Sequence, residues 1–231
     1  MNRMSETCSV CGGSTFASVS ILWPGLIAEW QLAPHEAEYI NEQQGSHCVS
    51  CRSNLRSIVL SDAILFHANS ALPLRDFVVS PAAQNLRVLE INQAGDLSEV
   101  LARLPGRVLA SYPDVDIHAM PYADGSFDLV AHSDTIEHVR QPIRALAECR
   151  RVLKSGGALC FTAPIVVGRL TRSREGLAPS YHGNPADVRE DYLVWTEFGA
   201  DIWTHVLQAG FRATTIFTRR HPVAHAISSV R

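Results

Sequence analysis

The chain of 231 residues has no apolar run that approaches the roughly 20 residues needed for a membrane-spanning helix. It also lacks a strong charge of either sign. Its formal net charge is −3 at pH 7, so its composition does not point to nucleic acid or an anionic membrane as a partner. Internal repeats and low-complexity tracts are missing as well. With 46% hydrophobic residues, a chain of this length can form one full domain and a smaller one.

The first residues lack the features of a secretory signal. Met1 to Glu6 lead directly towards Cys8, without a charged start followed by an apolar segment. We therefore expect a cytoplasmic protein, in which cysteine thiols stay reduced.

Four of the six cysteines form two Cys-x-x-Cys pairs, Cys8 with Cys11 and Cys48 with Cys51. Tetrahedral zinc takes four thiolate ligands, and a gap of two residues lets neighbouring thiolates reach one metal. Disulfides and a redox-active pair are the alternatives, and a reducing compartment argues against the first. The spacing predicts one structural zinc ion in a small zinc-ribbon-like module.

Helix signals surround the second cysteine pair. Pro34 and the carboxylates that follow it favour a helix start, and Gly45 favours its end. Asn54 is a suitable cap for a second helix that continues to about Asn69 with an apolar stripe. We expect a cysteine-rich module with its following helix at 1–69, a linker at 70–85 and a larger domain at 86–231.

The larger domain alternates strand and helix patterns. Strands are expected at 86–91, 107–110, 114–117, 126–131, 157–162 and 211–218, and helices at 96–104, 141–153 and 197–209. Such alternation with short links predicts an α/β, Rossmann-like fold, with a mostly parallel sheet and helices on both faces. In this architecture a ligand binds beyond the carboxyl ends of the strands.

Four motifs follow one another in this domain. They are Val88-Leu89-Glu90-Ile91, Met-Pro-Tyr-Ala-Asp-Gly-Ser-Phe-Asp-Leu-Val at 120–130, Thr135-Ile136-Glu137-His138-Val139, and Arg-Val-Leu-Lys-Ser-Gly-Gly at 151–157. Through their order and spacing, residues 86–218 resemble a class I S-adenosylmethionine-dependent methyltransferase of the type 11 kind. No single motif is decisive, but those between 121 and 157 are specific in combination. A cysteine module ahead of such a domain is similar to an arrangement in some bacterial methyltransferases.

The resemblance implies a cofactor site for S-adenosylmethionine at the carboxyl edge of the sheet. The residues expected to touch the cofactor are Glu90, Asn92, Gly95, Asp116 and Ser133. Glu90 ends the first strand, where its carboxylate can accept hydrogen bonds from the ammonium group of the cofactor. The alternative for Glu90 is a solvated strand end. Asp116 occupies the family position that contacts the adenine amino group.

The sequence departs from the family pattern at two places. The loop after the first strand, Asn92-Gln93-Ala94-Gly95, has one glycine where the family has several. The acidic residue that normally ends the second strand and holds the ribose is missing, because residues 111–116 lead almost directly to the third expected strand. We therefore expect weaker cofactor binding than is typical of the family.

Candidate residues for the acceptor side come from two regions. The resemblance implies that His138 lies near the methionine end of the cofactor, and a structural histidine is the alternative. In the long segment 165–195, the candidate base is His182, and the candidate acceptor-binding residues are Tyr181, Arg169, Arg172 and Arg174. A structural turn at His182 and solvated arginines are the alternatives.

Two classes of function fit these features. The first is methyl transfer to a small-molecule or sugar-like acceptor. The second is a non-catalytic, degenerate methyltransferase fold that acts as a scaffold or binding protein. The cysteine module carries several carboxylates and few basic residues, so nucleic acid is not an expected partner.

Overall fold

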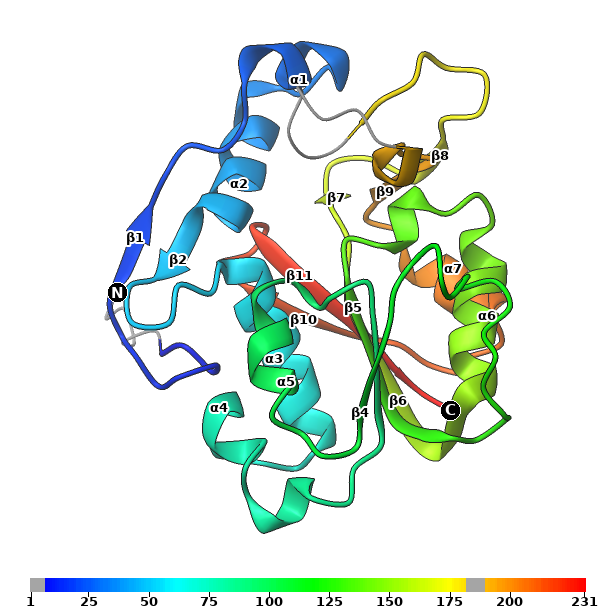
Figure 1. The fold of residues 1–231 in the computed structure, drawn as a ribbon. Coiled ribbons are helices and arrows are strands. Elements are labelled where there is room, and N and C mark those ends of the chain that lie inside the picture. Colours follow the sequence, from blue (N-terminus) through cyan, green and yellow to red (C-terminus); the bar gives the residue numbers. More distant parts are fainter. Residues whose placement is uncertain (1–6, 182–189) are drawn as a thin grey trace.

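The computed structural model describes residues 7–181 and 190–231 (Figure 1). A six-stranded sheet forms its centre, in the order β10-β11-β6-β5-β3-β4. The strands are β3 (Val88–Ile91), β4 (Arg107–Ala110), β5 (Phe127–Ser133), β6 (Leu153–Thr162), β10 (Thr215–Arg219) and β11 (Ala224–Val230). The pairs β3–β4, β3–β5 and β5–β6 are parallel, whereas β11 runs antiparallel to both of its neighbours. The predicted mostly parallel sheet is therefore confirmed.

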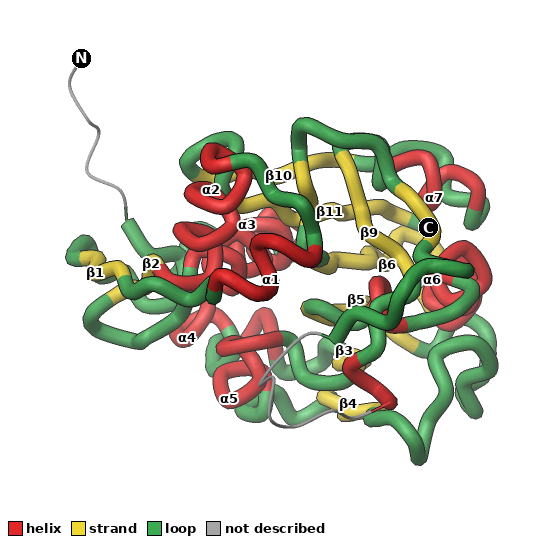
Figure 2. The backbone as a smooth tube through the Cα atoms, turned by 90° about the horizontal axis from the view of Figure 1, so that it is seen from above, coloured by secondary structure: helices red, strands yellow, loops and turns green. Residues whose placement is uncertain are grey.

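Helices cover both faces of this sheet (Figures 1 and 2). Successive side chains of a strand point to opposite faces. In β5, Leu129 and Ala131 belong to the core beneath α3 (Leu55–His67), while Val130 belongs to the core beneath α6 (Pro142–Val152). The short helix α7 (Trp203–Gln208) packs beside α6, and α5 (Ser98–Leu101) follows the 3-10 turn η2 (Gly95–Leu97).

The cysteine region consists of two short strands and two helices. β1 (Phe16–Ser18) pairs antiparallel with β2 (Ser46–Cys48), and α1 (Pro24–Glu29) and α2 (Pro34–Gly45) lie between them in the chain. The end of α2 at Gly45 and the cap of α3 confirm two predictions. The Asn54 side chain accepts a hydrogen bond of 2.8 Å from the backbone N–H of Ser57.

Helix α3 packs mainly against β11, β10 and β6. It is therefore part of the layer that covers the sheet, although the sequence groups it with the cysteine module. Two short turns, α4 (Leu74–Phe77) and η1 (Pro81–Ala83), connect α3 to β3. The proposed division of the chain at 70–85 stays a prediction. Among the residues described, no helix has the length and apolar character needed to cross a bilayer.

A second, small sheet lies beside the central one. It has the order β7-β9-β8 and consists of β7 (Ile165–Val166), β8 (Arg172–Ser173) and β9 (Thr196–Gly199). The predicted helix at 197–209 is wrong over its first residues, because Thr196–Gly199 pair with strands on both sides. The helix begins only at Trp203. The 3-10 turn η3 (Ile136–His138) packs against β9, and a second one, η4 (Glu190–Tyr192), precedes β9 in the chain.

The predicted strand at 114–117 is also wrong. These residues form turns, in which the N–H of Val115 bonds to the carbonyl of Ser111 and the N–H of Ala119 bonds to that of Asp116. Local hydrogen bonds therefore replace strand pairing, and β4 is the edge of the central sheet.

Candidate functional site

A cavity of about 840 Å³ opens at the carboxyl ends of β3, β4 and β5. Residues from four segments line it, namely 92–93, 111–119, 134–144 and 191–195. This is the edge at which the parallel-sheet architecture predicts a ligand. Three of the predicted site residues line the cavity directly: Asn92, Asp116 and His138.

The loop after β3 has the backbone of a glycine-rich turn although it contains a single glycine. Asn92, Gln93 and Gly95 all have positive φ angles, of 52°, 65° and 56°. Asparagine tolerates this left-handed conformation better than most residues. The Asn92 side-chain oxygen also accepts a hydrogen bond of 2.8 Å from the N–H of Tyr112, which ties the loop to the segment after β4.

Glu90 is completely buried beneath this loop. One carboxylate oxygen accepts a hydrogen bond of 2.7 Å from the N–H of Ala94, and the other accepts one of 2.6 Å from Nε of Arg107. The carboxylate is therefore not a solvated strand end, and its contacts here hold the loop in place. Direct contact with the cofactor ammonium stays a prediction.

Gly95, the last residue of this loop, lies next to Ser133 at the end of β5. A Cβ atom on Gly95 would come within 3.0 Å of Ser57 Oγ and 3.4 Å of Ser133 Oγ, so both the positive φ and the close packing favour glycine. The hydroxyls of Ser133 and Thr162 are hydrogen-bonded at 2.8 Å. These contacts connect the loop to the ends of β5 and β6.

Asp116 lies at the edge of the cavity with 57% of its side chain exposed. Its Oδ1 accepts hydrogen bonds of 2.8 Å from both the backbone N–H and Nδ1 of His118. The bond from this backbone N–H lowers the pKa of Asp116 below its usual value. The cavity therefore presents an ionised carboxylate, which can accept a hydrogen bond from an amino group.

His138, at the end of η3, also lines the cavity. Its Nδ1 lies 3.1 Å from the carbonyl oxygen of Leu193, and because a carbonyl can only accept, this nitrogen carries the proton. The Nε2 atom lies 3.6 Å from a carboxylate oxygen of Glu137. The backbone N–H of Trp195 donates to the carbonyl of Glu137 at 2.8 Å, and the Arg140 guanidinium lies 3.9 Å from the centre of the Trp195 ring.

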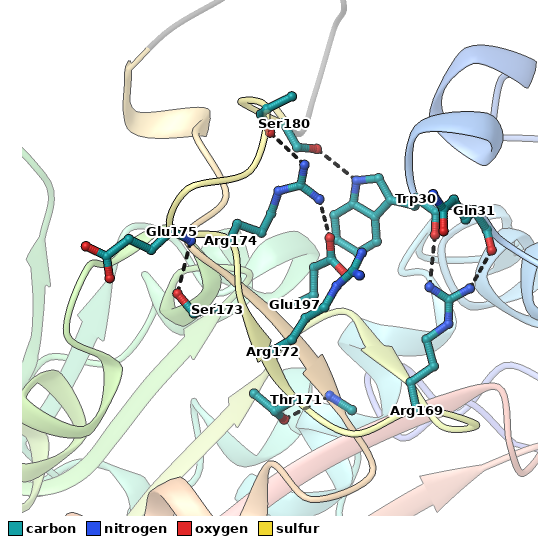
Figure 3. Close-up of polar contacts among 12 residues, drawn as sticks. Trp30, Gln31, Arg169, Thr171, Arg172, Ser173, Arg174, Glu175, Ser180 and Glu197 are labelled. Atoms are coloured by element: carbon teal, nitrogen blue, oxygen red, sulfur yellow. Dashed lines mark hydrogen bonds and ion pairs between the residues drawn. The ribbon is translucent and has the colours of Figure 1, made fainter.

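The three arginines predicted to bind the acceptor are engaged by carboxylates. Figure 3 shows Arg172 and Arg174 beside Glu197, and Arg169 with its hydrogen bonds to Trp30 and Gln31. Arg169 binds Glu36, whereas Arg172 and Arg174 both bind Glu197. None of the three lines the cavity in the part of the chain that the structure describes. Their role in acceptor binding stays a prediction, and the observed contacts stabilise the segment that follows β7.

The remaining acceptor candidates lie on the same segment. Tyr181 forms an isolated β-bridge with Leu193, next to the cavity wall. His182 lies outside the residues that the structure describes, so its predicted role as a base is not tested here.

Several cavity residues were not predicted from the sequence. Asp134, which follows β5, lines the cavity and forms an ion pair with Arg56 of α3. Its position directly after a buried strand is a feature of the sequence from which it could have been predicted as a site residue. Arg140 and Tyr192 also line the cavity, but they reach it through loop conformations that no local pattern indicates.

The four N-terminal cysteines come together as predicted. Their sulfur atoms all lie within 4.8 Å of one another, and the thiols are not joined by disulfides. Each pair forms a similar turn. The N–H of Gly12 bonds to the Cys8 carbonyl at 2.7 Å, and the N–H of Arg52 bonds to the Cys48 carbonyl at 2.8 Å. Four clustered soft ligands fit tetrahedral zinc, which supports the predicted metal site.

The comparison with known families and proteins gives a consistent result. Residues 77–161 match the family model of a methyltransferase domain. The ubiquinone biosynthesis O-methyltransferase of Cereibacter sphaeroides is 30% identical over 112 residues, covering 38% of this chain and 45% of that protein. The sarcosine/dimethylglycine N-methyltransferase of Halorhodospira halochloris is 44% identical over 52 residues, covering 22% of this chain and 19% of that protein. This chain thus matches less than half the length of either relative.

Solved structures of similar proteins are more distant in sequence. The CurJ carbon methyltransferase is 15% identical with a TM-score of 0.44, covering 89% of this chain and 69% of that chain. A phosphoethanolamine N-methyltransferase of Haemonchus contortus is 16% identical with a TM-score of 0.38, covering 62% of this chain and 37% of that chain. The segment matched by the family model contains β3, β4, β5 and nearly all of β6, and the cavity lies at the carboxyl ends of the first three of these strands. Residues 77–161 of this chain thus carry its similarity to the methyltransferase domain family.

Proposed function

We propose that the protein transfers a methyl group from S-adenosylmethionine to a small-molecule acceptor. The observation that carries this proposal is the position of the cavity, at the carboxyl ends of the strands that match the methyltransferase family. The loop after β3 supports it, because its positive φ angles give it the backbone conformation of a glycine-rich turn. No observation favours the non-catalytic alternative.

The residues of the cavity divide into a cofactor side and an acceptor side. Asn92 and the loop over Glu90 form the floor of the cofactor side, and the ionised Asp116 accepts a hydrogen bond from the adenine amino group. His138 and Trp195, which line the same cavity, form the acceptor side. The bound cofactor supplies a methyl group on a positively charged sulfur, which a nucleophilic acceptor atom can attack directly.

The protein then has two tasks in this reaction. It must align the acceptor atom with the methyl group, and it must receive the proton that a hydroxyl or ammonium acceptor loses. His138 is the described residue best placed to receive that proton, since Nδ1 is held by the Leu193 carbonyl and Nε2 lies beside Glu137. His182 is the second candidate.

The names of the relatives point to small acceptors, namely methylated glycines and quinone precursors. A panel of small amines, phenols and sugars, assayed with S-adenosylmethionine labelled in its methyl group, tests the proposal. We expect label transfer to at least one acceptor class, and a rate reduced by about 10²-fold or more in His138→Ala if this residue is the base. A protein that transfers no label and binds no cofactor would instead fit the scaffold function.

We also propose that Cys8, Cys11, Cys48 and Cys51 hold one structural zinc ion with no open coordination position. Four thiolates complete a tetrahedral site and leave no place for a substrate. The site lies in the N-terminal module, so its role is to stabilise that module and not to take part in methyl transfer.

A further inference from the structure

The N-terminal helices are joined to the segment after β7 by a buried hydrogen bond (Figure 3). The indole Nε1 of Trp30, just after α1, donates to Oγ of Ser180 at 2.8 Å. Trp30 is 5% exposed and Ser180 is fully buried. A buried indole N–H is costly to leave unpaired, so this bond fixes two segments that lie 150 residues apart in the chain.

A second group of contacts holds the same two segments together. Arg169 donates to both carboxylate oxygens of Glu36, at 2.9 and 2.5 Å, and to the carbonyl oxygens of Trp30 and Gln31 at 2.9 and 2.6 Å. Glu36 is 5% exposed, so its carboxylate is largely protected from water. The helix α2 therefore holds the start of the segment, while Trp30 holds its far end at Ser180.

Ser180 in turn supports the wall of the cavity. Its carbonyl accepts a hydrogen bond of 2.9 Å from the N–H of Val194. The neighbouring carbonyl of Leu193 accepts from His138, and the N–H of Trp195 donates to the carbonyl of Glu137. An unbroken series of contacts thus runs from Trp30 through Ser180 and residues 193–195 to His138.

We propose that Trp30 is a positioning residue, through which the N-terminal module holds residues 193–195 against His138 and so shapes the acceptor side of the cavity. That this side of the cavity binds the acceptor rests on the proposed function. The coupling between Trp30 and residues 193–195 does not. The side-chain hydrogen bonds described for Asn92 and Asp116 go to Tyr112 and His118, which lie outside this series. Loss of the Trp30 bond should therefore disturb the acceptor wall and leave cofactor binding intact.

Hydrogen exchange of backbone amides, followed by mass spectrometry, tests the proposal without an acceptor. Trp30→Phe removes the donor, Ser180→Ala removes the acceptor oxygen, and the double variant removes both. We expect about five-fold faster exchange at Val194 and Trp195 in each variant, the factor that corresponds to loss of one hydrogen bond. The double variant should exchange no faster than the single ones, because all three lose the same bond.

The matched control is Trp203→Phe, which alters a tryptophan that is 41% exposed on α7. It should leave exchange at 193–195 unchanged. A general loss of stability would also speed exchange in β5 and β6, so those strands serve as an internal reference. As a second readout, the ring-nitrogen NMR signals of His138 should move in Trp30→Phe, because its Nδ1 partner is less firmly held.

Two outcomes would overturn the proposal. One is unchanged exchange at 193–195 in both single variants. The other is an effect of the double variant equal to the combined effects of the two single ones, which would mean that the two side chains act separately. If Trp30→Phe does not fold, Ser180→Ala alone decides. Failure of the wild-type protein to bind S-adenosylhomocysteine would contradict the proposed function but not this coupling.

Discussion

At the scale of single residues, the cavity depends on side chains that replace glycines. Asn92 adopts a φ of 52° and also bonds to the N–H of Tyr112, so one residue supplies both a turn conformation and a link between two loops. A glycine would supply the conformation but not the link. The departure from the family pattern at this loop is therefore compatible with an open cofactor site.

Substitution of Asn92 separates these two contributions. Asn92→Ala loses the hydrogen bond and places a less tolerant residue at positive φ, so the free energy of unfolding should fall by about 2 kcal/mol. Asn92→Gly loses only the bond and relaxes the backbone, so the loss should be smaller. Chemical denaturation measures both values, and an alanine variant as stable as the glycine variant would contradict this explanation.

The buried His132 should make the stability of the protein depend on pH. Burial lowers its pKa from 6.5 to about 4, and within the described chain neither ring nitrogen has a hydrogen-bond partner. Between these pH values the unfolded chain binds a proton that the folded protein does not, so stability should fall as the pH drops from 6.5. The resulting loss in the free energy of unfolding should reach about 3 kcal/mol near pH 4.

The control for this pH effect is His132→Phe, which keeps an aromatic ring stacked on Phe161. Its stability, followed by urea denaturation from pH 7 to 4.5, should change less steeply than that of the wild type. Part of the slope should remain, because burial also lowers the pKa of His225 to about 4. An unchanged slope would show that His132 is not the group responsible.

At the scale of elements, local signals predicted some parts of the fold better than others. The limits of α2 and the start of α3 follow from Pro34, Gly45 and the Asn54 cap, which act within a few residues. The sequence did not predict β9 at Thr196–Gly199 or the turns at 114–117. Strand formation there depends on partners that are distant in the chain, and such pairing leaves little trace in local sequence.

The same distinction applies to the candidate site. Asn92, Asp116 and His138 were found because they occupy positions in or beside recognisable motifs, and all three line the cavity. The arginines at 169–174 were chosen for their charge, but Glu36 and Glu197 engage them. Spacing along the chain does not reveal which carboxylate will lie opposite a given guanidinium.

The proposed zinc site predicts the metal content and the stability of the cysteine module. Elemental analysis should find about one zinc per chain, and Cys48→Ser should lower both the zinc content and the melting temperature, because metal binding is coupled to folding of such modules. Cys149→Ala is the control, since Cys149 is a buried residue of α6, away from the cluster. A purified protein that contains no metal, and whose melting a chelator leaves unchanged, would contradict the metal site.

At the scale of the whole molecule, the N-terminal region and the sheet domain share one core. Leu55, Ile58 and Leu60 of α3 lie in the same apolar cluster as Cys8 and Cys48 of the cysteine module and Ala131 of β5. Arg219 of β10 binds Asp62 of α3, which adds a polar link across this layer. Both regions should therefore unfold in a single transition, and the cavity should depend on the integrity of both.

Calorimetric titration of the wild-type protein with S-adenosylhomocysteine tests the central proposal most directly. If the cavity at Asn92 and Asp116 is the cofactor site, one molecule should bind per chain, and Asp116→Asn should weaken binding by about ten-fold because a charged hydrogen-bond acceptor is lost. Affinity should be lower than is typical of the family. No binding at millimolar concentration would contradict the account.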